Sequence, residues 1–249
     1  MVKPSKLSLL SLAFCFVLIL FSQINLFAIK DLSIAKENVI ISRVIDGDTF
    51  QLQDGRTIRL ANINSPEKNS PLSVRSFNFL RQFENKTVSI QVLTTDKYGR
   101  QVARVYEEYY INQKIVELGL ASKFLVQEDE DKLFFDIEDK AIRSQQGIWN
   151  HSRYYGCFKL KVEPKLEFVS ITNLCSISLK GFSIKDESRK IYKFQDINET
   201  VVRLYSENGQ NTKDVLFWNS QTHIWNDDKD TAYLFDNENH IAAYSSYGY

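Results

Sequence analysis

The sequence predicts a mostly β protein with a few helices, organised as two domains. Short alternating runs of apolar and polar residues, separated by turn residues, occur in both halves of the chain, and such runs are typical of β-strands. Helical spacing of apolar residues is confined to the first half. The chain has 249 residues, of which 43% are hydrophobic and 13% aromatic, so it can form two modest packed cores.

The formal net charge of the chain is zero, from 31 basic and 31 acidic residues. No global electrostatic field therefore draws this protein to nucleic acid, which counts against a strong nonspecific DNA-binding protein. A protein that acts on nucleic acid through a local site needs only local positive charge. The composition leaves that possibility open.

The first 28 residues form a targeting segment. Lys3 and Lys6 precede an apolar run over residues 7–21, and Ala28 ends a candidate cleavage site. We expect residues 1–28 to be a signal peptide or, if uncleaved, an N-terminal anchor. The protein is then exported: secreted, periplasmic or membrane-anchored. Cys157 and Cys175 remain in the mature chain, where they either form an intramolecular disulfide or lie as separate buried thiols.

The first half predicts five strands and three helices. Asp54-Gly55 is a favoured hairpin dipeptide and separates two of the strands. Ser70 and Pro71 begin a helix, and Gly119 and Gly147 end the other two. In the first helix, the side chains expected to pack on the strands are Val74, Phe77, Leu80 and Phe83. The strands are expected at residues 39–45, 49–52, 57–63, 87–93 and 101–106, and the later helices at 112–118 and 129–145.

The second half predicts a β-sandwich. Periodicity fades over residues 151–165, where Pro164 indicates a linker. Beyond it, short strands recur about every ten residues, which is typical of a sandwich. We expect two independently folding domains, at residues 38–150 and 166–249. The strands are expected at residues 167–171, 182–185, 191–194, 201–205 and 233–235.

Residues 42–67 combine groups that suit phosphodiester chemistry. Asp46 and Asp48 offer hard oxygen ligands that suit a cation such as calcium. Arg59 suits a phosphate because its planar fork matches two phosphate oxygens. Glu67 could orient or deprotonate a water molecule. Taken singly, these residues are better explained structurally, Asp46 and Asp48 by a turn and Arg59 and Glu67 by a surface ion pair.

Four ordered motifs make residues 39–149 resemble the staphylococcal nuclease (thermonuclease) family. They are VIDGDTF with RLANINSPE, DKYGRQVARVY, NQKIVELGLA and a closing GIW. The resemblance implies an OB-type five-stranded β-barrel with packed helices. It also implies an endonuclease that hydrolyses DNA and RNA phosphodiester bonds with Ca²⁺.

The resemblance also implies residue roles. Arg59 and Arg100 would clamp the scissile phosphate, and Glu67 would act on the attacking water. Lys97 and Tyr98 would bind the neighbouring phosphate. The metal ligands would be Asp48, Asn64 and the carbonyl oxygen of Ser65, with Asp46 and Thr49 holding metal-bound waters in a second shell.

Two departures from the family pattern affect these roles. Asn64 replaces a calcium-binding carboxylate, which removes a negative charge and should weaken calcium binding. Leu125 and Gln127 replace two tyrosines that contact substrate, and acidic residues 128–131 follow them. We expect base stacking to be lost and phosphates to be repelled there.

The second half resembles a lamin-tail domain. The motifs that carry the resemblance are ITNLCSISLKGFSIKD, at residues 171–186, and WNDDKDTAYLFDNEN, at residues 225–239. The resemblance implies an immunoglobulin-like β-sandwich that attaches the enzyme to an envelope surface, a protein partner or nucleic acid. The alternatives are a noncatalytic nucleic-acid-binding barrel that kept the nuclease fold, and a surface scaffold protein.

Overall fold

The computed structural model describes residues 36–68, 72–188 and 190–249. Contacts divide the chain into two units, Met1–Glu37 and Asn38–Tyr249. The predicted signal peptide and the predicted helix start at Ser70 and Pro71 lie outside the described residues. Within the described residues, no helix is both long enough and apolar enough to span a membrane.

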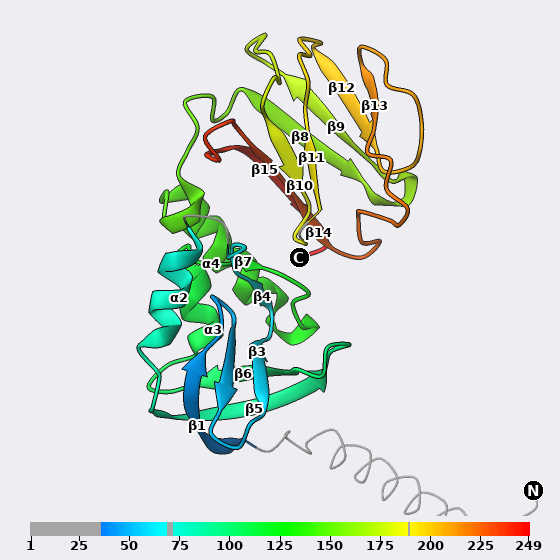
Figure 1. The fold of residues 1–249 in the computed structure, drawn as a ribbon. Helices are drawn as coiled ribbons and strands as arrows, with labels where there is room; N and C mark the ends of the chain where they lie inside the picture. The colour runs from blue at the N-terminus through cyan, green and yellow to red at the C-terminus, as the bar shows by residue number, and fades with distance from the viewer. Residues whose placement is uncertain (1–35, 69–71, 189) are drawn as a thin grey trace, which may run out of the picture. The chain divides into compact units, whose positions relative to one another are not determined.

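A closed five-stranded barrel forms the first half of the second unit, in the order β1-β2-β3-β6-β5 (Figure 1). Strands β3 and β6 pair in parallel. The expected strand at 57–63 breaks after Leu60, because Asn62 has a φ of 67° and turns the chain. The barrel strands are β1 (Glu37–Val44), β2 (Thr49–Leu52), β3 (Thr57–Leu60), β5 (Thr87–Thr95) and β6 (Gln101–Tyr106). Beside the barrel, β4 (Ile63–Asn64) pairs with β7 (Ser122–Lys123).

Helices pack against the barrel where the periodicity predicts them. The helix from Ser73 buries Phe79 and Leu80, whereas Val74 is 57% exposed, so the prediction that Val74 packs on the barrel is wrong. Gly119 follows the helix Ile111–Glu117 with a φ of 62°, as expected for a residue that ends a helix. The later helix ends at Arg143, with a positive φ of 54° at Gln145, so the prediction that Gly147 ends it is wrong. The helical elements are α2 (Ser73–Arg81), α3 (Ile111–Glu117), η1 (Glu128–Glu130), α4 (Asp131–Arg143) and η2 (Gly147–Trp149).

Two four-stranded sheets form the second half, in the orders β11-β10-β14-β15 and β13-β12-β9-β8. Apolar residues from both sheets share one core, which includes Ile171, Leu204, Leu234 and the buried Trp225. The strands are β8 (Phe158–Glu163), β9 (Phe168–Asn173), β10 (Ser183–Lys185), β11 (Ile191–Lys193), β12 (Val201–Tyr205), β13 (Val215–Phe217), β14 (Asp230–Phe235) and β15 (Ile241–Tyr247).

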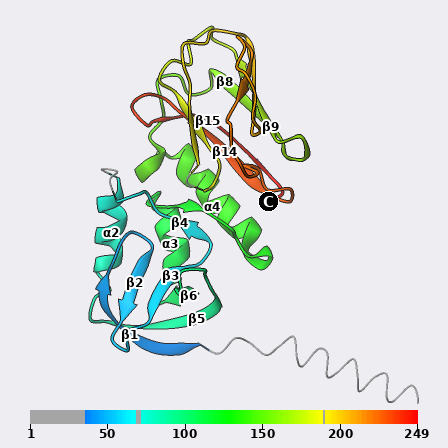
Figure 2. The ribbon, with the colours of Figure 1, turned by 45° about the vertical axis from the view of Figure 1, so that its right-hand side comes forward.

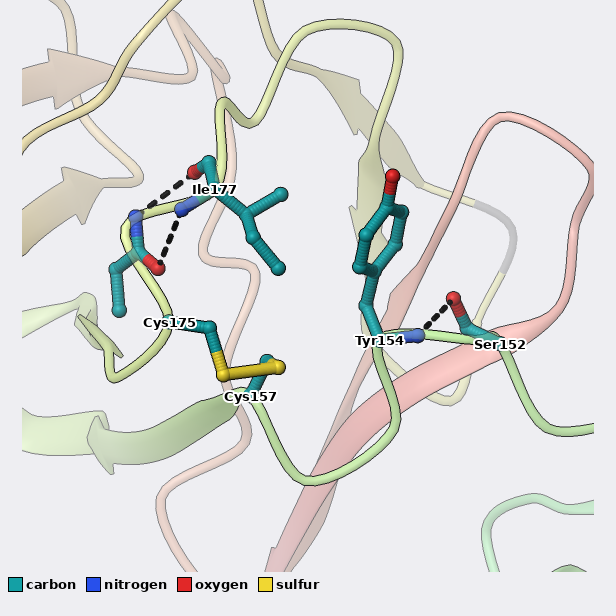
Figure 3. The surroundings of a disulfide bond; sticks show 6 residues. Ser152, Tyr154, Cys157, Cys175 and Ile177 are labelled. Carbon is teal, nitrogen blue, oxygen red and sulfur yellow. Dashed lines mark hydrogen bonds between the residues drawn. A yellow bond between two sulfur atoms is a disulfide. The ribbon is translucent and has the colours of Figure 1, made fainter.

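Strand β8 corrects the predicted linker. It lies inside residues 151–165 and pairs with β9 over its whole length. A disulfide bond joins Cys157, directly before β8, to Cys175, shortly after β9 (Figure 3). The bond therefore ties together the end of the hairpin where Phe158 pairs with Asn173.

The two halves share a packed boundary. Helix α4 contributes Ala141 and Ile142 to a cluster with Tyr233 of β14 and Ile241 of β15, and Figure 2 shows α4 beside these strands. Trp149 stacks on Tyr233, with ring centroids 5.2 Å apart. Barrel-side and sandwich-side residues therefore build one continuous apolar layer.

A buried lysine anchors the same boundary. The side chain of Lys123 in β7 is fully buried, and its ammonium nitrogen lies 2.8 Å from a carboxylate oxygen of Glu138 and 2.9 Å from one of Glu187. The ammonium group also donates to Thr231 and lies 4.5 Å from the ring centroid of Tyr249. Burial opposes the charged form of Lys123, but the two glutamates outweigh it and raise the pKa of Lys123. Nothing in the sequence predicts this network.

Candidate active site

The turn between β1 and β2 places Asp48 inside the molecule. Its side chain is only 1% exposed. One carboxylate oxygen accepts a hydrogen bond from the Thr49 hydroxyl at 2.8 Å, and the other accepts from the backbone and hydroxyl of Ser65 at 3.0 and 3.1 Å. Gly47 is required here, because a Cβ atom would lie 2.6 Å from Ser76 and 2.8 Å from Ser65.

The two aspartates of this turn differ in their electrostatics. Burial disfavours ionised Asp48, but Arg59 and the hydrogen bonds from Ser65 and Thr49 outweigh burial and lower its pKa. Burial and the negative charge of Asp48 raise the pKa of Asp46. Asp48 is therefore the more acidic of the two carboxyl groups.

Arg59 lies beside Asp48 near the end of β3. One guanidinium nitrogen is 3.8 Å from the Asp48 carboxylate, and the group donates to the carbonyl oxygens of Leu60 and Ile63, both at 3.0 Å. The guanidinium also lies 5.6 Å from the ring centroid of Phe124. Sequence reasoning missed Phe124, since an aromatic residue after a two-residue strand carries no distinctive signal.

Arg100 approaches the same corner from the turn between β5 and β6. Its guanidinium is 3.5 Å from the Thr49 hydroxyl and is held by Asp96 at 2.8 Å. Tyr98 is 72% exposed at the tip of this turn, with the Lys97 ammonium 5.2 Å from its ring centroid. The structure thus brings Arg59 and Arg100 to one corner, whereas Lys97 and Tyr98 lie at its exposed edge.

Asn64 contacts residues from both halves of the chain. Its side-chain oxygen faces Arg59 at 3.5 Å, and its amide nitrogen donates to the backbone carbonyl of Glu187 at 3.4 Å. An aspartate could accept from Arg59 but could not donate to that carbonyl. The amide at position 64 therefore fits the boundary between the halves. Glu67 lies three residues further on, exposed, and lines a cavity with Asn64 and Ser65.

The oxygen donors at this corner suit calcium in kind. Asp46 and Asp48 offer carboxylate oxygens, and Asn64 and Ser65 offer uncharged ones, all hard ligands. Among the described residues, no group of three or more histidine, cysteine, aspartate and glutamate residues could hold a metal ion. Two carboxylates and two uncharged oxygen donors would give a calcium ion a set of low charge.

The acidic run after β7 is less repulsive than the sequence suggests. Arg104 pairs with Asp129 and with Glu130, both at 2.7 Å, and Lys229 pairs with Asp131 at 2.5 Å. These two cations pair with three of the four acidic residues and offset two of the four negative charges. The expectation that residues 128–131 repel phosphates therefore stays a prediction, for a run of reduced charge.

The sequence of this chain is similar to those of known nucleases. Residues 57–151 match the family described as staphylococcal nuclease homologue. An uncharacterised endonuclease of Escherichia coli O157:H7 is 31% identical over 116 residues, 44% of this chain and 75% of that protein. The thermonuclease of Staphylococcus intermedius is 30% identical over 165 residues, 59% of this chain and 98% of that protein. The chain belongs to the staphylococcal nuclease family, and it is a nuclease.

Proposed function

We propose that this protein is an exported, calcium-dependent endonuclease that hydrolyses phosphodiester bonds of DNA and RNA. The observation that carries the proposal is the convergence of two arginines on one corner of the barrel. Arg59 lies 3.8 Å from Asp48, and Arg100 lies 3.5 Å from Thr49, the neighbour of Asp48. Two permanently charged groups at one corner suit a scissile phosphate.

In the proposed reaction, a water molecule attacks phosphorus in line with the departing 5′ oxygen. Glu67 accepts the proton of the water, and the products are a 3′-phosphate and a 5′-hydroxyl. Arg59 and Arg100 hold the phosphate and stabilise the negative charge of the transition state. Asp48, Asn64 and Ser65 would hold calcium, with Asp46 and Thr49 around them, and bound calcium would supply further positive charge. Lys97 and Tyr98 would bind the adjacent phosphate.

Export is part of the proposal. The basic and apolar pattern of residues 1–28 supports it, and so does the Cys157–Cys175 disulfide, a bond favoured in oxidising compartments. Extracellular calcium is plentiful, so a site of low charge can fill there. The second half, which resembles a lamin-tail domain of the immunoglobulin-like type, would attach the enzyme to an envelope or protein partner.

A noncatalytic nucleic-acid-binding protein is the second candidate. Asn64 favours this candidate for two reasons. Its amide nitrogen donates to the Glu187 carbonyl across the boundary between the halves, and an uncharged residue lowers the negative charge of the proposed metal site. The presence of Arg59, Glu67 and Arg100 together favours the enzyme, since binding alone does not need a base beside the phosphate.

A plasmid-degradation assay separates the two candidates. Protein lacking residues 1–28 is expected to cleave plasmid with calcium and to stop when a chelator is added. Arg59→Ala and Arg100→Ala should each lower turnover by orders of magnitude, through loss of several kcal/mol of transition-state stabilisation. A folded Arg59→Ala variant as fast as wild type would show that the site is misassigned. Cleavage that continues unchanged after a chelator is added would rule out a requirement for calcium.

A further inference from the structure

A cavity of about 630 Å³ lies beside the candidate active site and takes its walls from both halves of the chain. Asn64, Ser65 and Glu67 line it from the barrel side. Lys185 of β10, Lys193 of β11 and Phe235 of β14 line it from the sandwich side. Its volume is within the range of known small-ligand sites, so it can hold one nucleotide of a chain. The lining includes the proposed general base and two lysines from the other half of the chain.

The two lysines differ in their surroundings. Lys193 is exposed on strand β11. Lys185 lies over the rings of Tyr233 and Phe235, at 5.4 and 5.8 Å from their centroids. Burial lowers the pKa of Lys185, although nearby carboxylates, including Glu67, act in the opposite direction. A phosphate entering the cavity would add negative charge beside Lys185 and offset the cost of its burial.

The rest of the lining is largely apolar. Phe235, Ile148 and Ile191 line the cavity, and Ile191 is 54% exposed. Apolar surfaces beside a cation suit a nucleotide, whose base is flat and apolar on its faces and whose phosphate is charged. Leu125 and Gln127 offer no aromatic ring at the two positions after β7 where the family pattern has tyrosines.

We propose that the sandwich completes the substrate site of the nuclease. One nucleotide of a single-stranded nucleic acid occupies the cavity, with its phosphate against Lys193 and Lys185 and its base against Phe235 and Ile191. The strand then continues past Glu67 to the corner formed by Arg59 and Arg100. This inference rests on the proposed function for the identity of the strand, and on the shared lining for its location.

Binding of a short fluorescent single-stranded DNA, measured by anisotropy in calcium-free buffer, tests the inference. Lys193→Gln should raise Kd several-fold, and Lys193→Glu should raise it further. The slope of log K against log salt should fall by roughly 0.7, the value for one phosphate contact with a single strand. KM for cleavage in calcium should rise with Kd. The matched controls are Lys213→Gln and Lys213→Glu, because the Lys213 side chain is 78% exposed in the same half of the chain and is not among the cavity residues.

The possible outcomes separate this inference from the proposed function. If wild type cleaves DNA and the Lys193 variants match the Lys213 variants in Kd and salt slope, the cavity assignment is wrong and the nuclease assignment stands. If binding depends on Lys193 but wild type does not cleave with calcium, the cavity assignment stands and the nuclease assignment fails. Absence of binding by wild type overturns the cavity assignment directly. Thermal melting of each variant shows that it is folded.

Discussion

At the scale of single residues, position 64 shows how one side chain serves two contacts. An aspartate there would add charge for calcium, but the asparagine donates to the Glu187 carbonyl while its oxygen faces Arg59. Burial raises the pKa of Glu187, which lies in an acidic neighbourhood with Glu138. A carboxylate at position 64 would add a further negative charge to the same neighbourhood. Asparagine at position 64 therefore favours docking of the two halves, and in the proposed calcium site it would lower metal affinity.

Asn64→Asp should change calcium affinity and stability in opposite directions. The added carboxylate should lower the calcium concentration for half-maximal activity, which we expect near the millimolar range for wild type. In chelator, the melting temperature should fall, because the donor to the Glu187 carbonyl is lost. Calcium titration of activity and thermal melting measure the two effects. Asn150→Asp, at an exposed position, is the control for added charge. An unchanged calcium titration would mean that residue 64 is not a ligand.

At the scale of elements, the two-residue strand β7 contacts both the candidate active site and the boundary between the halves. It pairs with β4, which carries Asn64, and it delivers Lys123 to Glu138 of α4 and to Glu187 of the sandwich. The hydroxyl of Tyr233 in β14 also donates to Glu138 at 2.7 Å. Strand β7 therefore links the candidate active site to the boundary between the halves.

Lys123→Met should destabilise the protein by about 3–5 kcal/mol, because it leaves Glu138 and Glu187 buried without their cation. Denaturant unfolding measures the change. Lys132→Met is the matched control, since Lys132 pairs with Asp136 on an exposed part of α4 and should contribute at most about 1 kcal/mol. Equal effects of the two substitutions would show that the buried network does not stabilise the fold.

Local signals in the sequence predict much of the barrel, but contacts between distant residues lie beyond them. The Asp54-Gly55 hairpin and the helix end at Gly119 are set by backbone conformation, so these two predictions are confirmed. The later helix ends at Arg143, four residues before Gly147. Apolar and polar residues alternate regularly over residues 158–163, as in a strand. Pro164, however, favours a linker, so the sequence alone predicts a linker over these residues. The catalytic assignments rest on family motifs and remain predictions. Lys123, by contrast, looks like a surface residue until the fold supplies its partners.

At the scale of the whole molecule, the halves are joined more firmly than the sequence suggests. The sequence predicts independent domains, whereas contacts place Asn38–Tyr249 in one compact unit. The apolar cluster of α4, η2, β14 and β15, together with the Lys123 network, crosses the expected boundary. These contacts argue against independent folding.

Truncation after Lys165 tests this point. The shortened chain loses β9, the partner of β8, and leaves Lys123 without Glu187 and Thr231. We expect a lower melting temperature and a broader transition than for the longer protein, with reduced nuclease activity. Calorimetry and the plasmid assay measure both. A cooperative melt with full activity would instead establish the barrel as an independent domain.

The Lys123 network also has a consequence for the order of events during folding. Lys123 and Thr231 are 108 positions apart, and Glu138 and Tyr233 are 95 apart. Contacts so distant along the chain form slowly, because a long loop must close before they stabilise anything. During synthesis the barrel residues are made before the sandwich residues that contact them. Asn64 can donate to the Glu187 carbonyl only after the sandwich has been made. We therefore expect the contact between Asn64 and Glu187 to form last, after the sandwich strands have been made.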